Sequence, residues 1–134
     1  MPTSPLPPHL LEFLGRPNPA VIATVWPDGH PVSVATWYLF EEGQILVNMD
    51  EGRRRLDYLR ADPRVTLTVL AADDWYTHVS VQGQAVRFDN DPDLADIDRL
   101  AQHYRGHPYP NRDQMRVSAW VDVATWHAWG SLAG

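Results

Sequence analysis

The stretch from Asn48 to Val65 carries a block of positive charge in an otherwise acidic chain. Five of the eleven basic residues lie in it, although the 134 residues together have a formal net charge of −6. Arg53, Arg54 and Arg55 stand side by side where a helix is expected to begin. Guanidinium groups bind phosphates and carboxylates through paired, charge-assisted hydrogen bonds. The block could therefore hold an anionic ligand.

A second interpretation is that the arginine block is only the solvated face of a surface helix. Its i,i+4 ion pairs would be Asp50 with Arg54, Glu51 with Arg55 and Arg53 with Asp57. Each such pair contributes roughly 0.2–0.5 kcal/mol. Against this, a helix N-terminus already carries partial positive charge, so three adjacent cations there are unfavourable unless an anion offsets them. Both interpretations stay open at this point.

The elements that must position the arginine block are mainly strands. We expect strands over residues 20–26, 31–40, 45–49, 62–71, 75–88 and 116–129, and short helices over 7–14, 50–61 and 91–106. The first three strands should form a meander that opens with an Asp-Gly hairpin turn. Asp50 is expected to cap the second helix, and Gly83 to mark a bulge or close approach. Six or seven such strands predict a mainly β fold, a closed antiparallel barrel without exposed edges.

Length and composition limit the function classes. The chain predicts a single domain over residues 1–134, with a flexible tail over 1–9. Its apolar runs are too short to span a bilayer and no secretory leader is visible, so we expect a cytoplasmic protein that binds no membrane. The acidic net charge argues against nucleic acid as a partner. Without cysteine there is no disulfide or thiolate chemistry.

Other reactive residues are few. His103 and His107 have the spacing of a helical metal site, but Gly106 and Pro108 end the helix and no third ligand stands out, so no metal is predicted. No nucleophile-elbow pattern suggests a hydrolase. His78 and Tyr104 are alternatives for a proton donor to a substrate, or are structural side chains. Of the six tryptophans, Trp37 or Trp75 could stack on a flat ligand ring, and the other four, Trp26, Trp120, Trp126 and Trp129, are expected in the core or a dimer interface.

The order of these segments resembles that of a known family. The run "GRRRLDYLRADPRVTL", preceded by "IATVWPDGHPVSVATWYLFEEGQILVNM" and followed by "WYTHVSVQGQAVRF", resembles the flavin- and deazaflavin-binding split barrels, the pyridoxamine-phosphate-oxidase-like proteins. More narrowly, it is similar to their small B-group F420-dependent oxidoreductases. The resemblance covers roughly residues 10–130, and its most specific marks are "DPRV" and the V-x-G-x-A pattern at 81–85. It implies a split antiparallel β-barrel.

The resemblance also implies a set of cofactor-binding residues. The phosphate would be bound by Arg53, Arg54 and Arg55, with Arg55 as the principal contact, and the tricyclic ring would lie along Val34, Ala35 and Thr36. Asn48 and Met49 stand where the family carries a small polar pair, and Asn48 could still donate a hydrogen bond to a phosphate. Arg60, on the same helix, would extend the basic strip toward an anionic tail. Trp75 and Tyr76 match the aromatic group that reaches the ring from the other protomer, which implies a homodimer with shared sites.

The function implied is hydride transfer between the deazaflavin F420 and a small organic acceptor. The cofactor carries that chemistry and the protein supplies binding and orientation, which agrees with the lack of a visible catalytic dyad. Two alternatives remain open. One is an FMN-dependent oxidoreductase on the same barrel, and the other is a carrier that binds a flavin or deazaflavin without turnover.

Overall fold

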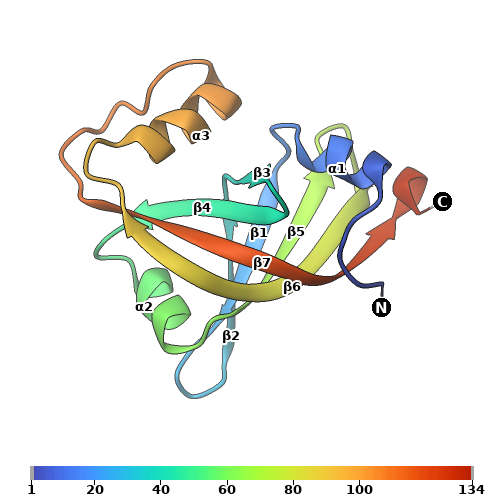
Figure 1. Ribbon diagram of the computed structural model, residues 1–134, viewed down its shortest axis with the longest axis horizontal. Coiled ribbons are helices and arrows are strands. Elements are labelled where there is room, and N and C mark those ends of the chain that lie inside the picture. The colour runs from blue at the N-terminus through green and yellow to red at the C-terminus, as the bar shows by residue number, and fades with distance from the viewer. Residues whose placement is uncertain (1, 134) are drawn as a thin grey trace.

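A computed structural model describes residues 2–133 and confirms the mainly β class (Figure 1). The strands are β1 (Ala20–Val25), β2 (Pro31–Thr36), β3 (Leu39–Glu41), β4 (Gln44–Asp50), β5 (Arg64–Ala71), β6 (Asp74–Asn90) and β7 (Arg116–Trp129). The helices are α1 (Pro8–Leu14), α2 (Arg54–Ala61) and α3 (Ala95–Arg105), followed at the end by the short 3-10 helix η1 (Gly130–Leu132). All seven strands belong to one antiparallel sheet.

The strand order shows where the barrel is split. It runs β2-β1-β5-β6-β7-β4-β3, so β2 and β3 are the two end strands of the described sheet. The hairpin of β1 and β2 is confirmed, with Ala20 opposite Thr36. The second pairing of the expected meander, β3 with β4, is also present, but the middle strand is divided and its two parts, β2 and β3, lie at opposite ends of the order. No pairing joins β2 to β3 within residues 2–133, so the barrel is not closed, and the split antiparallel barrel implied by the resemblance is confirmed.

The single strand expected over residues 31–40 is interrupted at Trp37 and Tyr38. The Tyr38 side chain is fully buried, and its hydroxyl donates to the Arg16 carbonyl at 3.3 Å. Trp37 stacks on Tyr104 of α3. Burying these two rings takes the chain away from β2 and into β3, which no local alternation of apolar residues could have indicated.

The core lies between the curled faces of the sheet. Strands β1 and β5 alternate buried with partly exposed residues, as a half-buried strand should. From α2, Leu56 and Leu59 are fully buried. Burying a Leu side chain stabilises by roughly 1.5–3 kcal/mol, so these two residues hold α2 against the barrel.

Gly83 lies at the predicted irregularity. The register between β6 and β7 shifts between Gln82 and Gly83. A Cβ atom at Gly83 would overlap the backbone of Asp122 on β7. The bulge and the close approach are therefore both confirmed, and they have one cause, the contact of two backbones.

Two expectations about the ends of elements differ from the structure. The N-cap residue of α2 is Arg53, without a side-chain cap, while Asp50 is the last residue of β4. The expected Asp50 cap is wrong, because its carboxylate instead contacts Arg116 and Arg53. The Pro-rich segment expected as a flexible tail lies along β7, where the Ser4 amide donates to the Ala124 carbonyl at 3.1 Å.

No helix among residues 2–133 has the length and apolar character needed to cross a bilayer.

Candidate cofactor site

Two hollows open beside β2. One, the α2 hollow, has a volume of about 580 Å³, and the other, the α3 hollow, of about 590 Å³. Ala35, Arg55 and Arg116 line both, so the hollows meet at these three residues. In Figure 1, α3 lies above β4 and α2 below β6, at the same end of the sheet. Each hollow is thus bounded by its own helix.

Most of the residues predicted to contact a cofactor line one of these hollows. The α2 hollow contains Val34, Ala35, Met49, Arg53, Arg54 and Arg55, and the α3 hollow contains Ala35, Thr36, Asn48 and Arg55. Residues from β2, β4 and α2, separated by some twenty positions in the sequence, are therefore brought to one place. The register of β1 with β2, and the burial of Leu56 and Leu59, position them.

The arginine block is not neutralised by its own helix. None of the three expected i,i+4 ion pairs is present in the described chain. Arg53 contacts Asp50 at 3.4 Å instead, and Arg60 pairs with Glu51 at 3.1 Å. Arg54 and Arg55 make no ion pair with any residue from 2 to 133. The solvated-face interpretation is wrong about these pairs, because the chain between Asp50 and Arg53 is not helical.

Arg55 is the most unusual member of the block. Its Nε atom is buried and has no hydrogen-bond partner among residues 2–133. Burial lowers the pKa of the Arg55 guanidinium, and the positive charges of Arg53 and Arg116 lower that pKa further. A buried, unpaired donor costs about 1–3 kcal/mol, more when charged. Arg55 lines both hollows, so an anion bound in either would offset the charge of its guanidinium.

Arg116 is a site residue that the sequence analysis missed. It begins β7 and is only 8% exposed. Its Nε donates to Asn48 Oδ1 at 2.6 Å, a second nitrogen contacts Asp50, and the guanidinium carbon lies 4.8 Å from the centre of the Tyr109 ring. A single arginine after a loop carries no signal in the sequence. Only the pairing of Asp50 with Arg116 across β4 and β7 places it here.

Asn48 positions Arg116 rather than facing outward. Its Nδ2 donates to Asp91 at 3.2 Å and to Ser118 at 3.0 Å, while its Oδ1 accepts from Arg116. Met49, the next residue on β4, points to the opposite face of the strand and is 1% exposed, in the core. Of the expected polar pair, Asn48 therefore supports an arginine and Met49 forms part of the floor of the α2 hollow.

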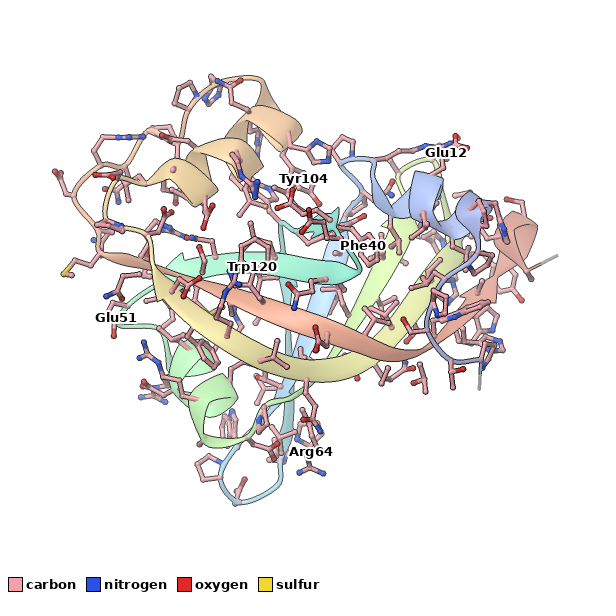
Figure 2. The ribbon with its side chains drawn as sticks, in the orientation of Figure 1. Glu12, Phe40, Glu51, Arg64, Tyr104 and Trp120 are labelled. Atoms are coloured by element: carbon pink, nitrogen blue, oxygen red, sulfur yellow. The ribbon has the colours of Figure 1, made fainter. Side chains whose placement is uncertain are left out.

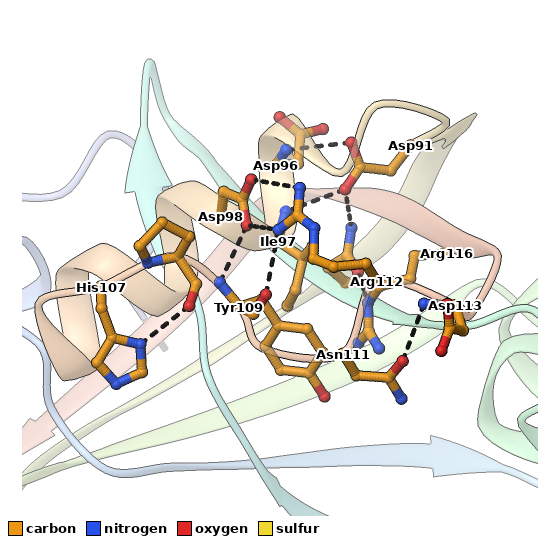
Figure 3. A network of polar contacts seen from close by, with 12 residues as sticks. Asp91, Asp96, Ile97, Asp98, His107, Tyr109, Asn111, Arg112, Asp113 and Arg116 are labelled. Atoms are coloured by element: carbon orange, nitrogen blue, oxygen red, sulfur yellow. Dashed lines mark hydrogen bonds and ion pairs between the residues drawn. The ribbon is translucent and has the colours of Figure 1, made fainter.

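A polar network holds α3 and the following loop over the α3 hollow (Figure 3). The Asp91 carboxylate accepts from the Asp96 and Ile97 amides at 3.1 and 3.0 Å, in the first turn of α3. The Asp98 carboxylate accepts from the Tyr109 amide at 3.0 Å and from Arg112 at 2.6 Å. The Arg112 guanidinium lowers the pKa of the Asp98 carboxyl. This clamp brings Tyr109 back to the Arg116 guanidinium.

An aromatic wall closes the α3 hollow. The Trp37 and Tyr104 rings stack with centroids 5.4 Å apart and planes 10° apart. In Figure 2 the Tyr104 side chain lies between α3 and β3, and its hydroxyl donates to the Asn18 carbonyl at 2.6 Å. Burial raises the pKa of the Tyr104 phenol, so its proton stays in this internal hydrogen bond. His78, the other proton-donor alternative, lies outside both hollows, stacked on Trp129.

Three predicted residues lie away from both hollows. Arg60 does not extend the basic strip on the face of Arg55, because five residues rotate a helix by about 140°, and Arg60 instead pairs with Glu51 and lies over Phe88. Trp75 and Tyr76 are 73% and 57% exposed at the start of β6. They lie at the far end of the β5–β6 pair from α2, a strand length of roughly 26 Å at 3.3 Å per residue.

Residues 6–130 match the family model described as pyridoxamine 5′-phosphate oxidase. No curated protein matches the chain in sequence.

Solved structures extend this comparison. An F420 reductase is 27% identical, with a TM-score of 0.82, over 90% of this chain and 98% of its own. A conserved hypothetical protein from Mycobacterium tuberculosis is 21% identical, with a TM-score of 0.67, over 95% of this chain and 86% of its own. General Stress Protein 26 from Bacillus anthracis is 19% identical, with a TM-score of 0.63, over 90% and 94%. The last two establish likeness of fold alone.

Proposed function

Because the chain belongs to the pyridoxamine 5′-phosphate oxidase family of split barrels, we propose that it is an oxidoreductase that uses the deazaflavin F420. The proposed reaction is hydride transfer between F420 and a small organic acceptor. The hydride chemistry is that of F420 when it is bound. The residues of this chain bind it, orient it and keep water from it.

The observation that carries this proposal is the unbalanced charge of the α2 hollow. Arg53, Arg54, Arg55 and Arg116 line it with a single carboxylate, Asp50. Such a concentration of cations in a chain of net charge −6 favours an anionic ligand. F420 carries a phosphodiester and a tail of several carboxylates, whereas FMN carries one phosphate. The excess of arginine therefore favours F420, as does the 27% identity to an F420 reductase.

The edge of β2 supplies the second part of the binding site. Because β2 pairs only with β1 in the described sheet, the backbone groups along its other edge are free to bond a ligand. Ala35 lies at the junction of the two hollows, between Val34 and Thr36. A tricyclic ring laid along this edge would have its phosphate arm directed to the arginines of α2.

The third part would come from a second copy of the chain. Trp75 and Tyr76 are exposed and too far along β6 to reach the arginine block of their own protomer. In a homodimer, the corresponding pair from the partner would cover the ring. Exposed large aromatic side chains are typical of such protein interfaces.

Fluorescence titration tests the choice of cofactor. The protein should bind F420 more tightly than FMN, and binding should weaken as salt rises, because the site is partly exposed. A preference for FMN of about ten-fold, which is 1.4 kcal/mol, would contradict the proposal. Enzyme and carrier are then separated by adding reduced F420 and a panel of acceptors. A carrier would bind F420 tightly and oxidise none of it.

A further inference from the structure

The α3 hollow also has an unbalanced charge. Its lining includes Arg55, Arg105 and Arg116, and no Asp or Glu from the described residues. Arg105 is exposed in the last turn of α3 and makes no ion pair within residues 2–133. The phosphate proposed above would engage Arg55 from the α2 side. Arg105 faces only the adjoining α3 hollow, and Arg116 lines both hollows where they meet.

Arg116 is prepared to bind an anion in the α3 hollow. Its Nε and one terminal nitrogen are held by Asn48 and Asp50, and Tyr109 packs on the plane of the guanidinium. The other terminal nitrogen makes no hydrogen bond with residues 2–133. A guanidinium fixed on three sides loses little freedom when it binds, and although Asp50 offsets part of its charge, its remaining nitrogen can donate a charge-assisted hydrogen bond to an anion.

The remaining walls are flat and apolar. Trp37 and Tyr104 stack, and Tyr109 meets the Trp37 ring edge-on with centroids 6.2 Å apart. Ile97 and Leu100 are buried behind them in a small cluster of their own. A hollow of about 590 Å³ lies within the range of small-molecule sites, which are mostly apolar with a few placed polar groups.

We propose that the α3 hollow binds the hydride acceptor, and that this acceptor is a flat, largely apolar anion whose charged group contacts Arg116 and Arg105. The inference rests on the proposed function, because it needs the cofactor ring along β2. The hollows meet at Ala35, so an acceptor in the α3 hollow lies beside the same stretch of β2 as that ring. The apolar body would lie against Trp37.

A matched pair of probes tests the inference. Cinnamate and cinnamamide have the same flat body and differ in charge, and their binding is measured by calorimetry with and without saturating F420. Cinnamate should bind about ten-fold more tightly than cinnamamide, the difference expected for one charge-assisted hydrogen bond. Both probes should bind while F420 stays bound.

Variants of the lining residues test which side chains cause the preference for cinnamate over cinnamamide. Arg105→Gln and Arg116→Gln should each reduce it, whereas Arg99→Gln should not, because Arg99 is on the same helix but pairs with Glu41 outside the hollow. Arg105 is exposed, so its variant tests the inference even if Arg116→Gln is poorly folded. Trp37→Leu should weaken both probes equally.

Three results would overturn the inference: equal affinity for the two probes, displacement of F420 by cinnamate, or a preference unaffected by Arg105→Gln. None of these three results contradicts the proposed function as long as the protein binds F420. Failure of F420 to bind would overturn the proposed function and the acceptor role together. The ratio of cinnamate to cinnamamide affinity, measured without F420, would still show whether the α3 hollow prefers an anion.

Discussion

We expect Arg55 to contribute more to ligand binding than to stability, since its Nε is buried without a partner among residues 2–133 and its charge is opposed by Arg53 and Arg116. We expect Arg55→Ala to weaken F420 binding by about ten- to a hundred-fold, the value of one or two charge-assisted hydrogen bonds. The free energy of unfolding should stay the same or rise by a few tenths of a kcal/mol, as when a like-charge pair is removed. Fluorescence titration and thermal melting measure both quantities.

A matched control for that variant is Arg64→Ala. Arg64 is an exposed arginine that pairs with Asp62 and lines neither hollow. Its loss should leave F420 affinity unchanged. If Arg55→Ala behaves in the same way, the arginine block is a solvated face after all.

Unlike Arg55, Asn48 is expected to contribute mainly to the stability of the fold. Asn48→Ala removes an acceptor from Arg116 and donors from Asp91 and Ser118, all of them buried. Leaving buried partners unpaired should lower the free energy of unfolding by about 1–3 kcal/mol, measured by chemical denaturation. If Asn48 instead donated a hydrogen bond directly to the cofactor phosphate, Asn48→Ala would weaken F420 binding and leave the free energy of unfolding unchanged.

At the scale of elements, the close approach of β6 to β7 depends on the absence of a side chain at Gly83. Gly83→Ala should destabilise the fold by more than about 1 kcal/mol, because its Cβ would displace the Asp122 backbone. Gly52→Ala is the control, since a Cβ at Gly52 meets nothing within 4 Å. Equal denaturation midpoints for the two variants would mean that the strands can move apart at no cost.

For the whole molecule, the exposed Trp75 predicts a homodimer whose sites combine two chains. Light scattering should give a mass twice that of one chain. Arg55→Ala and Trp75→Ala should each weaken F420 binding, with Trp75→Ala leaving the dimer intact. In a mixed dimer of the two variants, one site takes both defects and the other takes neither. Full-affinity sites should therefore reappear when the two variants are unfolded and refolded together.

The same mixing experiment separates the alternatives. If Arg55 and Trp75 served one site within a single chain, every site in the mixture would be defective. If light scattering gave the mass of a monomer, no partner could contribute aromatic residues to the site, and Trp75 would be an ordinary surface residue.

The sequence by itself determined most of the strands and helices, because alternation, turn residues and Pro or Gly stops are local properties. It also placed the arginine block at a helix start and Gly83 at an irregularity, and the order of its motifs indicated the family. Its errors share one cause. The break at Trp37 and Tyr38 and the separation of β2 from β3 depend on contacts with distant residues.

The tertiary structure alone decided which charges act together. Pairing of β4 with β7 brings Arg116 opposite Asp50, across more than sixty positions of chain. The Asp98 clamp brings Tyr109 and the loop after α3 back to Arg116. Strand pairing and burial are non-local, so a lone arginine after a loop has no distinguishing pattern in the sequence until the fold sets it between two hollows.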